Sequence, residues 1–418
     1  MVERARSHPA LWCILMLPFG ISSGFVSIAL AAQGKAAGLS VGDIASLVAL
    51  TLLPHTWKFL WAPVTDITLT KRRWYLLSNL VASVGIASFA LLPIGPSTLG
   101  VLQIVVFLQS LSTTTLGMAV EALMAHTVPR DEIGRASGWF QAGNLGGGGL
   151  GGGLGLMLVG SIGATGATLA VAAMSLACTA AVFMVHDVPA VAAEKGPLHA
   201  TVVALKDLWQ VVKTRAGTAA LVICFVPVGS GAAQSLFVAI SKDWGATDNT
   251  VALSNGALTG GVAAVGCFVG GWISDKLGRK RAYAAAGALL AVVAIGMAIA
   301  PRTPAMYVGF CLLYALVVGM CYGTFTGLVL DTIGAGAAAT KYNAFASLSN
   351  IPIMYMTVVN GAAHSAWGAT GLLLVDAGAG LIGLAVFGTF LLVVAVVVKR
   401  RLARTGAPPR AVVVPPAA

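Results

Sequence analysis

Two ionisable residues, Lys58 and Glu121, lie well inside long, mostly apolar stretches of sequence. Each sits about one helical turn from the end of its stretch, so the two side chains can lie at the same depth and pair. A charge at membrane depth costs a few kcal/mol, so a functional role is the first hypothesis for such a residue. Glu121 could take up a proton, and Lys58 could bind an anionic group or respond to the charge of Glu121. The alternative is a structural ion pair, or a Lys58 side chain that extends to the polar surface.

Amide and hydroxyl side chains form stripes along other apolar stretches. They recur at intervals of three and four residues, which is the spacing of one helix face. The stripes contain Gln109 with Thr113, then Gln141 with Asn144, and finally Asn343, Ser347 and Asn350. These side chains could line a cavity and bind the polar groups of a small molecule. Alternatively, they form hydrogen bonds between neighbouring helices.

The composition indicates which elements must position these residues. The chain has 418 residues, of which 58% are hydrophobic and 9% are charged, whereas soluble proteins are about 25% charged. This excludes a soluble enzyme, a disordered regulator and a disulfide scaffold. The six cysteines lie in apolar segments without Cys/His clustering, so we expect free thiols and neither a metal nor a cofactor.

The apolar segments are long enough for membrane helices, which need about 20 residues each. We predict an all-α polytopic membrane protein with twelve transmembrane helices. The predicted spans are 11–33, 41–62, 74–95, 98–125, 136–160, 163–185, 217–240, 250–272, 282–300, 304–330, 342–363 and 370–398.

The basic residues predict the orientation of these spans. Of 25 basic residues, 21 fall in the termini and the even-numbered loops, and three fall on the opposite side. Basic residues accumulate on the cytoplasmic side of membrane proteins, so we expect both termini in the cytoplasm. The net charge of +11 then faces an anionic lipid surface, and no nucleic-acid partner is needed to explain it.

The two halves of the chain match each other in register. At an offset of 209, Pro18 corresponds to Pro227 and Asp66 to Asp275; at an offset of 206, Asn144 corresponds to Asn350. Two six-helix halves related by a repeat are a transporter architecture, with the solute site between the halves. The predicted domains are an N-terminal half (1–186), a cytoplasmic linker (187–216), a C-terminal half (217–404) and a disordered cytoplasmic tail (405–418).

The loop after the eighth span carries a recognisable motif between Gly271 and Arg281. It resembles the signature G-x-x-x-D-[RK]-x-G-R-[RK]-[RK] of the major facilitator superfamily. The resemblance implies the major facilitator fold, with two pseudo-symmetric six-helix halves and alternating access. The copy in the first half keeps Asp66 and Lys71 but has Leu69 and Thr70 at the signature's Gly and Arg positions, so we expect a looser turn there.

In that superfamily each loop motif lies against the start of a helix in the other half. We therefore predict two latches that close the cytoplasmic side, one between Asp66 and Lys341 and one between Asp275 and Arg135. The gate residues predicted from the motif and the repeat are Asp66, Arg72, Gly271, Asp275, Gly278, Arg279, Arg281, Arg135 and Lys341.

A closer resemblance covers residues 54–66 and 121–155, with its motifs from Lys58 to Asp66 and from Glu121 to Gly134. These stretches resemble the AmpG-like permeases of the peptide/acetyl-CoA transporter family. The resemblance implies import of a polar or anionic solute, such as a muropeptide-like, acyl-CoA-like or siderophore-like compound. The hypothesis that this import is coupled to protons comes from Glu121. It also implies a multi-pass protein of the bacterial inner membrane, and we expect a monomer.

Several alternatives stay open. Within the transporters, the chain could be a ferric-siderophore permease or an exporter. Outside them, it could be a non-transporting membrane receptor or scaffold. An enzyme is not expected, because no convincing nucleophile or metal cluster is present. Asp331 and Asp376 are placed near membrane interfaces, where structural roles are expected, and the glycine-rich segments of spans 5 and 8, including Gly148, are expected to pack against each other.

Overall fold

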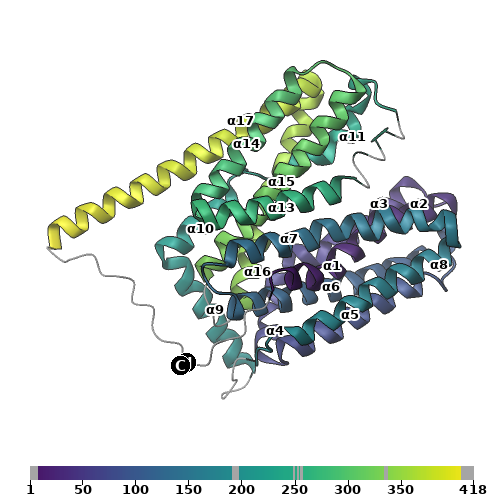
Figure 1. The fold of residues 1–418 in the computed structure, drawn as a ribbon, viewed down its shortest axis with the longest axis horizontal. Coiled ribbons are helices and arrows are strands. Elements are labelled where there is room, and N and C mark those ends of the chain that lie inside the picture. Colours follow the sequence, from purple (N-terminus) through teal and green to yellow (C-terminus); the bar gives the residue numbers. More distant parts are fainter. Residues whose placement is uncertain are drawn as a thin grey trace.

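The computed structural model describes residues 8–190, 197–247, 250–251, 254, 258–333 and 338–405, and the chain is almost entirely helical there. Figure 1 shows two groups of long helices that lie side by side, one from the first part of the sequence and one from the second. The predicted all-α polytopic fold is therefore confirmed. Apart from Thr405, the predicted tail lies outside the described residues.

The first group is purple to teal in Figure 1. It contains, in chain order, α1 (Ala10–Gly24), η1 (Phe25–Leu30), α2 (Ala31–Ala36), α3 (Val41–Trp57), η2 (Lys58–Leu60), α4 (Ala62–Ile67), α5 (Lys71–Ser88), η3 (Pro96–Thr98), α6 (Leu99–Thr127), α7 (Ile133–Gly148), η4 (Gly149–Leu154), α8 (Gly155–Ala177) and η5 (Cys178–Met184). Helix α9 (Pro197–Lys213) follows within the predicted linker.

The second group is green to yellow. It contains α10 (Arg215–Phe225), η6 (Ala232–Leu236), α11 (Phe237–Ile240), η7 (Ser241–Trp244), α13 (Leu258–Leu277), α14 (Arg279–Ile299), α15 (Pro304–Ile333), α16 (Ala338–Leu348) and α17 (Asn350–Thr405).

Seven helical stretches of the described chain are long and apolar enough to cross a membrane. Two of them, Ile133–Met184 and Ala338–Val393, each contain two arms that meet at a glycine with positive φ, Gly163 and Gly368. Only glycine adopts this backbone conformation without strain. With the shorter pieces α3–α4, α5 and α10–η7, helical segments occupy all twelve predicted spans.

Two of the predicted spans are interrupted. Span 2 breaks at η2, which carries Lys58. Span 7 ends its first helix at Phe225 and resumes at η6, because Pro227 cannot continue a helix and Gly229 and Gly231 have positive φ. The repeat partner of Pro227, Pro18, lies inside the continuous helix α1.

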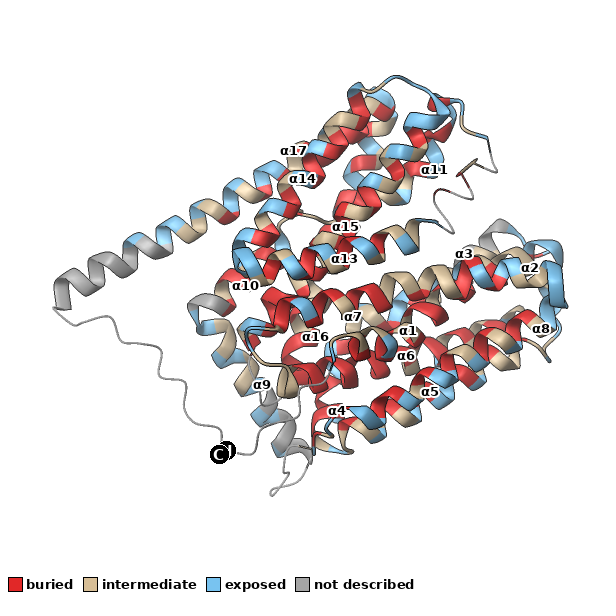
Figure 2. Cartoon of the chain, viewed as in Figure 1, coloured by how far each residue is buried: buried red, intermediate tan, exposed pale blue. Residues whose placement is uncertain are grey.

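The buried apolar clusters show where the two groups meet. One cluster contains Leu15 and Phe140 from the first group together with Val329, Tyr342 and Phe345 from the second. Two other clusters each belong to one group alone. The shared cluster lies at the helix ends next to the Lys/Arg-rich loops, so the groups are closed against each other at that end; Figure 2 shows buried residues concentrated between the packed helices.

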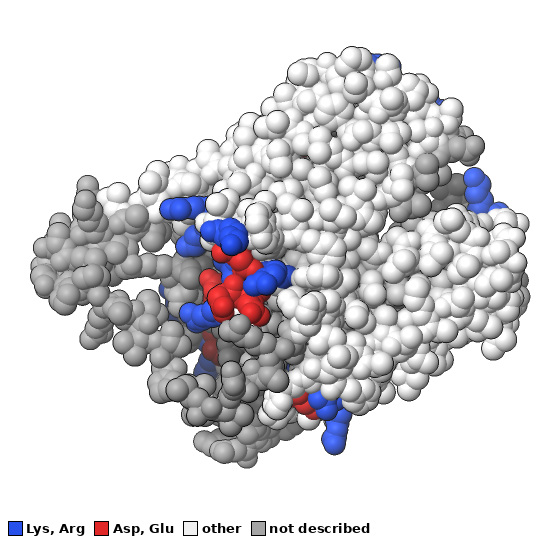
Figure 3. All heavy atoms as spheres, viewed as in Figure 1, with Lys and Arg blue, Asp and Glu red and all other residues white. Residues whose placement is uncertain are grey.

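Charged side chains also gather at one end. In Figure 3 most acidic and basic residues of the visible face cluster near α9 and α10, and a smaller charged group lies at the lower edge of the view. A few basic side chains lie at the opposite end, with a broad uncharged surface between. A wide uncharged belt is what a lipid bilayer requires of the protein surface. All six cysteines are free thiols, as predicted.

Candidate functional site

The structure brings the two predicted ionisable residues together. Lys58 begins η2 directly after the end of α3, and Glu121 lies near the end of α6. The Lys58 Nζ atom lies 3.9 Å from Glu121 Oε1, and both side chains are buried. The predicted charge pair is thus present, and the break in span 2 is the local feature that turns Lys58 inward.

The second half of the protein supplies the third member of this cluster. Asn343 of α16 donates a hydrogen bond of 2.9 Å from Nδ2 to Glu121 Oε2, and a second of 2.8 Å to the carbonyl of Ala339. Its Oδ1 atom is buried and has no hydrogen-bond partner among the described residues. The sequence predicted the Lys58–Glu121 pair and the polar stripe that contains Asn343 as separate features. It did not predict that Asn343 contacts Glu121 across the two halves.

His55 extends the cluster by one helical turn. Its Nδ1 atom lies 3.2 Å from the Thr114 hydroxyl, and its ring lies 5.0 Å from the ring of Phe19. Ser347 donates a hydrogen bond of 3.4 Å to the His55 carbonyl, which again joins the two halves. Sequence reasoning missed His55, although its position three residues before Lys58 is a usable signal.

A second polar connection joins the halves through the predicted stripe on α7. Gln141 donates a hydrogen bond of 2.7 Å to the Thr326 hydroxyl of α15, and the Tyr342 hydroxyl donates one of 3.1 Å to the same oxygen. Asn144 donates one of 2.9 Å to Gln141 Oε1. Gln141 therefore forms the hydrogen bond between helices that was the alternative to binding a solute, whereas in the described part of the chain the Asn144 side chain bonds only to Gln141 of its own helix.

Four of the seven predicted cavity residues line pockets, and these pockets are three separate ones. Asn144 reaches a cavity of about 250 Å³ between the halves, which is also lined by Ser23, Ser27, Gln234 and Thr259. Gln109 and Thr113 line a small pocket within the first half beside Phe19 and His55. Asn350 lines a pocket of about 70 Å³ beside the break in span 7.

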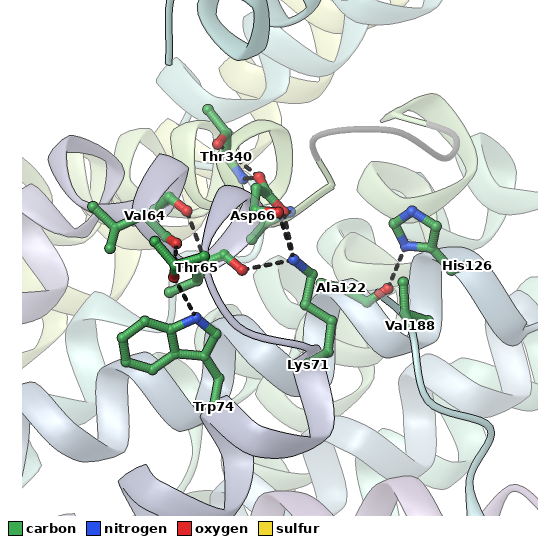
Figure 4. Close-up of polar contacts among 12 residues, drawn as sticks. Val64, Thr65, Asp66, Lys71, Trp74, Ala122, His126, Val188 and Thr340 are labelled. Atoms are coloured by element: carbon green, nitrogen blue, oxygen red, sulfur yellow. Dashed lines mark hydrogen bonds and ion pairs between the residues drawn. The ribbon is translucent and has the colours of Figure 1, made fainter. Parts of the chain in front are cut away.

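The first loop motif contacts the start of α16, but Asp66 bonds Ala339 and Thr340 there and not the predicted partner Lys341. Asp66 accepts hydrogen bonds from the Ala339 N–H at 3.3 Å, from the Thr340 N–H at 2.9 Å and from the Thr340 hydroxyl at 2.8 Å (Figure 4). Its ion partner is Lys71 at 3.5 Å, and Lys71 also donates to the Thr65 carbonyl at 2.6 Å. A carboxylate at the start of a helix is favourable, because it accepts the unpaired N–H groups there.

The prediction for Lys341 needs correction. Its Nζ atom lies 3.0 Å from Asp207 Oδ2 of α9 in the linker, so the Asp66 latch acts through the start of α16 and through Lys71. Arg72 also lies elsewhere than expected. It is bound to the end of span 6, where its guanidinium donates to the Val185 carbonyl and its N–H to Asp187.

The second loop motif contacts the start of α7, where its predicted partner Arg135 lies. Asp275 accepts hydrogen bonds from the Gly134 N–H at 2.9 Å and the Arg135 N–H at 2.7 Å at the start of α7, and Arg135 Nε lies 3.8 Å away. Arg279, four residues later, pairs with the same carboxylate and donates to the Arg130 carbonyl. Gly278 makes the turn with φ of 83°, while Arg281 is exposed.

The prediction that glycines pack spans 5 and 8 together is correct in part. A Cβ on Gly138 would lie 2.5 Å from the Cys267 carbonyl, and one on Gly271 would lie 2.5 Å from the Gly134 carbonyl. These glycines allow α7 and α13 to touch at the closed end. Gly148 instead faces the 250 Å³ cavity, and a Cβ there would meet nothing within 4 Å.

Asp331 and Asp376, the two acids expected near membrane interfaces, differ in their burial. Asp331 is exposed at the end of α15, as expected, but Asp376 is buried at 8% exposure. Packing from other helices therefore covers Asp376, so it is not the solvated acid that was expected at this position. Among the described residues no group of three His, Cys, Asp or Glu side chains could hold a metal ion.

Comparisons with known proteins agree with this geometry. The family profile of the Major Facilitator Superfamily matches residues 12–357. No curated protein sequence matches the chain. Among solved structures, an E. coli fucose:proton symporter variant is similar, with a TM-score of 0.70 at 15% identity over 91% of this chain and 98% of that chain.

Two further structures are similar to the same degree. The human organic anion transporter TETRAN gives a TM-score of 0.70 at 13% identity, covering 90% of this chain and 98% of its own. A structure of the transporter FucP in the outward conformation gives 0.69 at 14% identity, covering 91% and 98%. At these identities the similarity shows the fold alone.

Proposed function

Because the chain belongs to the major facilitator superfamily, and is thereby a multi-pass membrane transporter of small-molecule solutes, we propose that it couples import of a polar or anionic solute to protons. The two halves would open the solute site to one side of the membrane at a time. The observation that carries the proposal is the Glu121 cluster, where one carboxylate contacts Lys58 of its own half and Asn343 of the other.

The chemistry of this cluster explains how a proton could move the halves. Ionised Glu121 accepts the Asn343 N–H across the closed cytoplasmic end. Protonation would replace this charge-assisted hydrogen bond by a weaker neutral one and remove the anion that faces Lys58. A buried cation without an anion is costly, so Lys58 would favour an anionic group of the solute as its new partner. Proton and solute together would then weaken the cytoplasmic closure.

The lining of the cavity between the halves supports a polar solute. Ser23, Ser27, Asn144, Gln234 and Thr259 offer hydroxyl and amide groups to the 250 Å³ cavity. Such groups can recognise hydroxyls, amides or carbonyls by hydrogen bonds without a matching charge. An anionic group of the solute would instead be bound by Lys58. Two structural neighbours carry a sugar with protons and organic anions, respectively, and either chemistry suits this arrangement.

The resemblance to AmpG-like permeases supports a muropeptide-like, acyl-CoA-like or siderophore-like solute. The bias of 21 basic residues supports cytoplasmic termini, and the closed end that carries the latches is then the cytoplasmic one. We place the protein in a bacterial inner membrane as a monomer. A ferric-siderophore permease or an exporter is the alternative within transporters, and a receptor or scaffold is the alternative outside them.

Transport by purified protein in liposomes tests the proposal. The probes are a labelled anhydromuropeptide, a labelled acyl-CoA and a ferric siderophore, each assayed for exchange at equal pH and for uptake driven by an inward proton gradient. Glu121→Gln keeps the size and shape of the side chain, but the amide can neither bind nor release a proton. It should abolish gradient-driven uptake of the transported probe while leaving exchange measurable.

The matched control is Asp331→Asn, which removes an exposed carboxylate at the end of α15 and should behave as wild type. Gradient-driven uptake that survives in Glu121→Gln would make Glu121 structural. Absence of exchange for every probe, in wild-type protein that is folded, would favour the receptor or scaffold alternative.

A further inference from the structure

A second buried carboxylate lies in the C-terminal half, away from the Glu121 cluster. Asp376 is eight residues after the break at Gly368, which is about 12 Å along the second arm of α17. The Tyr314 hydroxyl of α15 donates a hydrogen bond of 2.8 Å to its Oδ2 atom, and Asn360 Nδ2 of the first arm donates one of 2.8 Å to Oδ1. Both partners are fully buried.

The surroundings of Asp376 offer no compensating charge. None of the ion pairs formed by the described residues includes it. The groups that face it are the Tyr314 phenol from α15, the Asn360 amide from its own helix and the Ala233 backbone from η6. Helix α14 also packs on α17, but its basic residues Arg279, Lys280 and Arg281 are in its first turn, at the opposite end of the helix. A carboxylate without a cation in an apolar interior tends to be neutralised by a proton.

The cluster is equipped to hold Asp376 in either protonation state. The Oδ1 atom of Asn360 is buried and has no hydrogen-bond partner among the described residues. With Nδ2 toward Asp376 the amide donates to the carboxylate; after a half-turn of the amide, Oδ1 can accept the proton of the carboxylic acid. The Tyr314 hydroxyl can likewise donate or accept. We propose that Asp376 is a proton-binding site of the C-terminal half, distinct from Glu121.

The position of the cluster gives this proton a route to the solute. The Ala233 backbone of η6, in the broken span 7, lies beside the Asp376 carboxylate, and η6 packs on α17. The next residue, Gln234, lines the 250 Å³ cavity between the halves. A proton on Asp376 would therefore change the contact between α17 and the segment that presents Gln234. This role in transport rests on the proton coupling proposed above, whereas the binding of the proton does not.

Infrared difference spectroscopy of the full-length protein in liposomes tests proton binding without any solute. The probe is the proton itself, and the signal is the carbonyl stretch of protonated carboxyl groups as the pH is lowered. The wild type should show a band that is lost in Asp376→Asn and retained in both Glu121→Gln and the exposed-site control Asp331→Asn. An identical difference spectrum in folded Asp376→Asn and wild type would overturn the proposal.

A second variant keeps the test decisive if Asp376→Asn fails to fold. Tyr314→Phe keeps the ring and removes the hydroxyl that bonds Oδ2, so the Asp376 band should move to higher frequency. A folded Tyr314→Phe protein with every carboxyl band unmoved would overturn the assignment. Because no solute is present, a negative result here leaves the transport assay with Glu121→Gln informative, and the two proposals fail independently.

Discussion

The two loop motifs are repeat equivalents, and they close the same end of the protein with the same geometry. Asp66 accepts N–H groups at the start of α16, and Asp275 accepts N–H groups at the start of α7. Each carboxylate belongs to one half, and each helix start belongs to the other. What the repeat preserves is therefore the contact between a carboxylate and a helix start.

The cation that accompanies each carboxylate differs. Asp66 is paired with Lys71, five residues later, and both side chains are 1% exposed. Asp275 is paired with Arg279, four residues later, and both are 12% exposed. The first loop has Thr70 where the second has Arg279, and Lys71 takes over the pairing. The first loop, which was expected to have the looser turn, is thus the more enclosed of the two. Asp66 and Lys71 are less hydrated than Asp275 and Arg279, so each relies more on its partner for stabilisation.

The largest expected effect is that of Asp66→Asn. The substitution removes the carboxylate that pairs with Lys71 and leaves a buried ammonium group without its ion-pair partner. Breaking a buried pair by removing one partner costs about 3–5 kcal/mol. We expect a loss of this size in the free energy of unfolding, measured by denaturant titration of the detergent-solubilised protein.

The double variant Asp66→Asn with Lys71→Met separates charge from hydrogen bonding. Methionine keeps an apolar side chain of similar length in the buried position. Because no unpaired charge remains, the double variant should be more stable than Asp66→Asn alone. A double variant no more stable than the single one would show that the α16 hydrogen bonds, and not Lys71, account for the loss.

Asp275→Asn should have a smaller effect and thereby sharpen the comparison. Arg279 and Arg135 are partly exposed and can be hydrated when the carboxylate is lost. The expected loss is that of hydrogen bonds to a charged acceptor, about 1.5–3 kcal/mol, in the same denaturant titration. Equal losses for Asp66→Asn and Asp275→Asn would refute the idea that enclosure distinguishes the two latches.

Much of the fold could be predicted because it depends on patterns within the chain. Apolar segment length predicted the helices, and the repeat with the Gly271–Arg281 motif placed Asp275 at the start of α7. The pairing of Lys58 with Glu121 also followed from their matched depths.

The rest depends on which helices pack against a residue, and sequence spacing does not contain that information. Asp376 was expected near an interface because it lies early in its span, but α15 and η6 cover it. Lys341 was assigned to Asp66 by the repeat, yet α9 brings Asp207 to it from the linker, which has no counterpart in the repeat. Asn343 was found in the stripe, but its contact with Glu121 depends on how the halves close.

The smallest expected effect is that of Arg135→Ala in the second latch. The Arg135 side chain was predicted to be the partner of Asp275 there. The Arg135 side chain is 52% exposed and its Nε atom lies 3.8 Å from Asp275, so the pair should contribute about 0–1 kcal/mol. The backbone N–H of Arg135, which donates to Asp275 at 2.7 Å, is unchanged by alanine.

Arg135→Pro provides the matched control, since proline is tolerated in the first turn of a helix but has no N–H to donate. In denaturant titrations Arg135→Ala should stay near wild type, while Arg135→Pro should lose about 1.5–3 kcal/mol as a hydrogen bond to a charged group disappears. The reverse order would mean that the side chains, and not the helix start, hold the second latch closed.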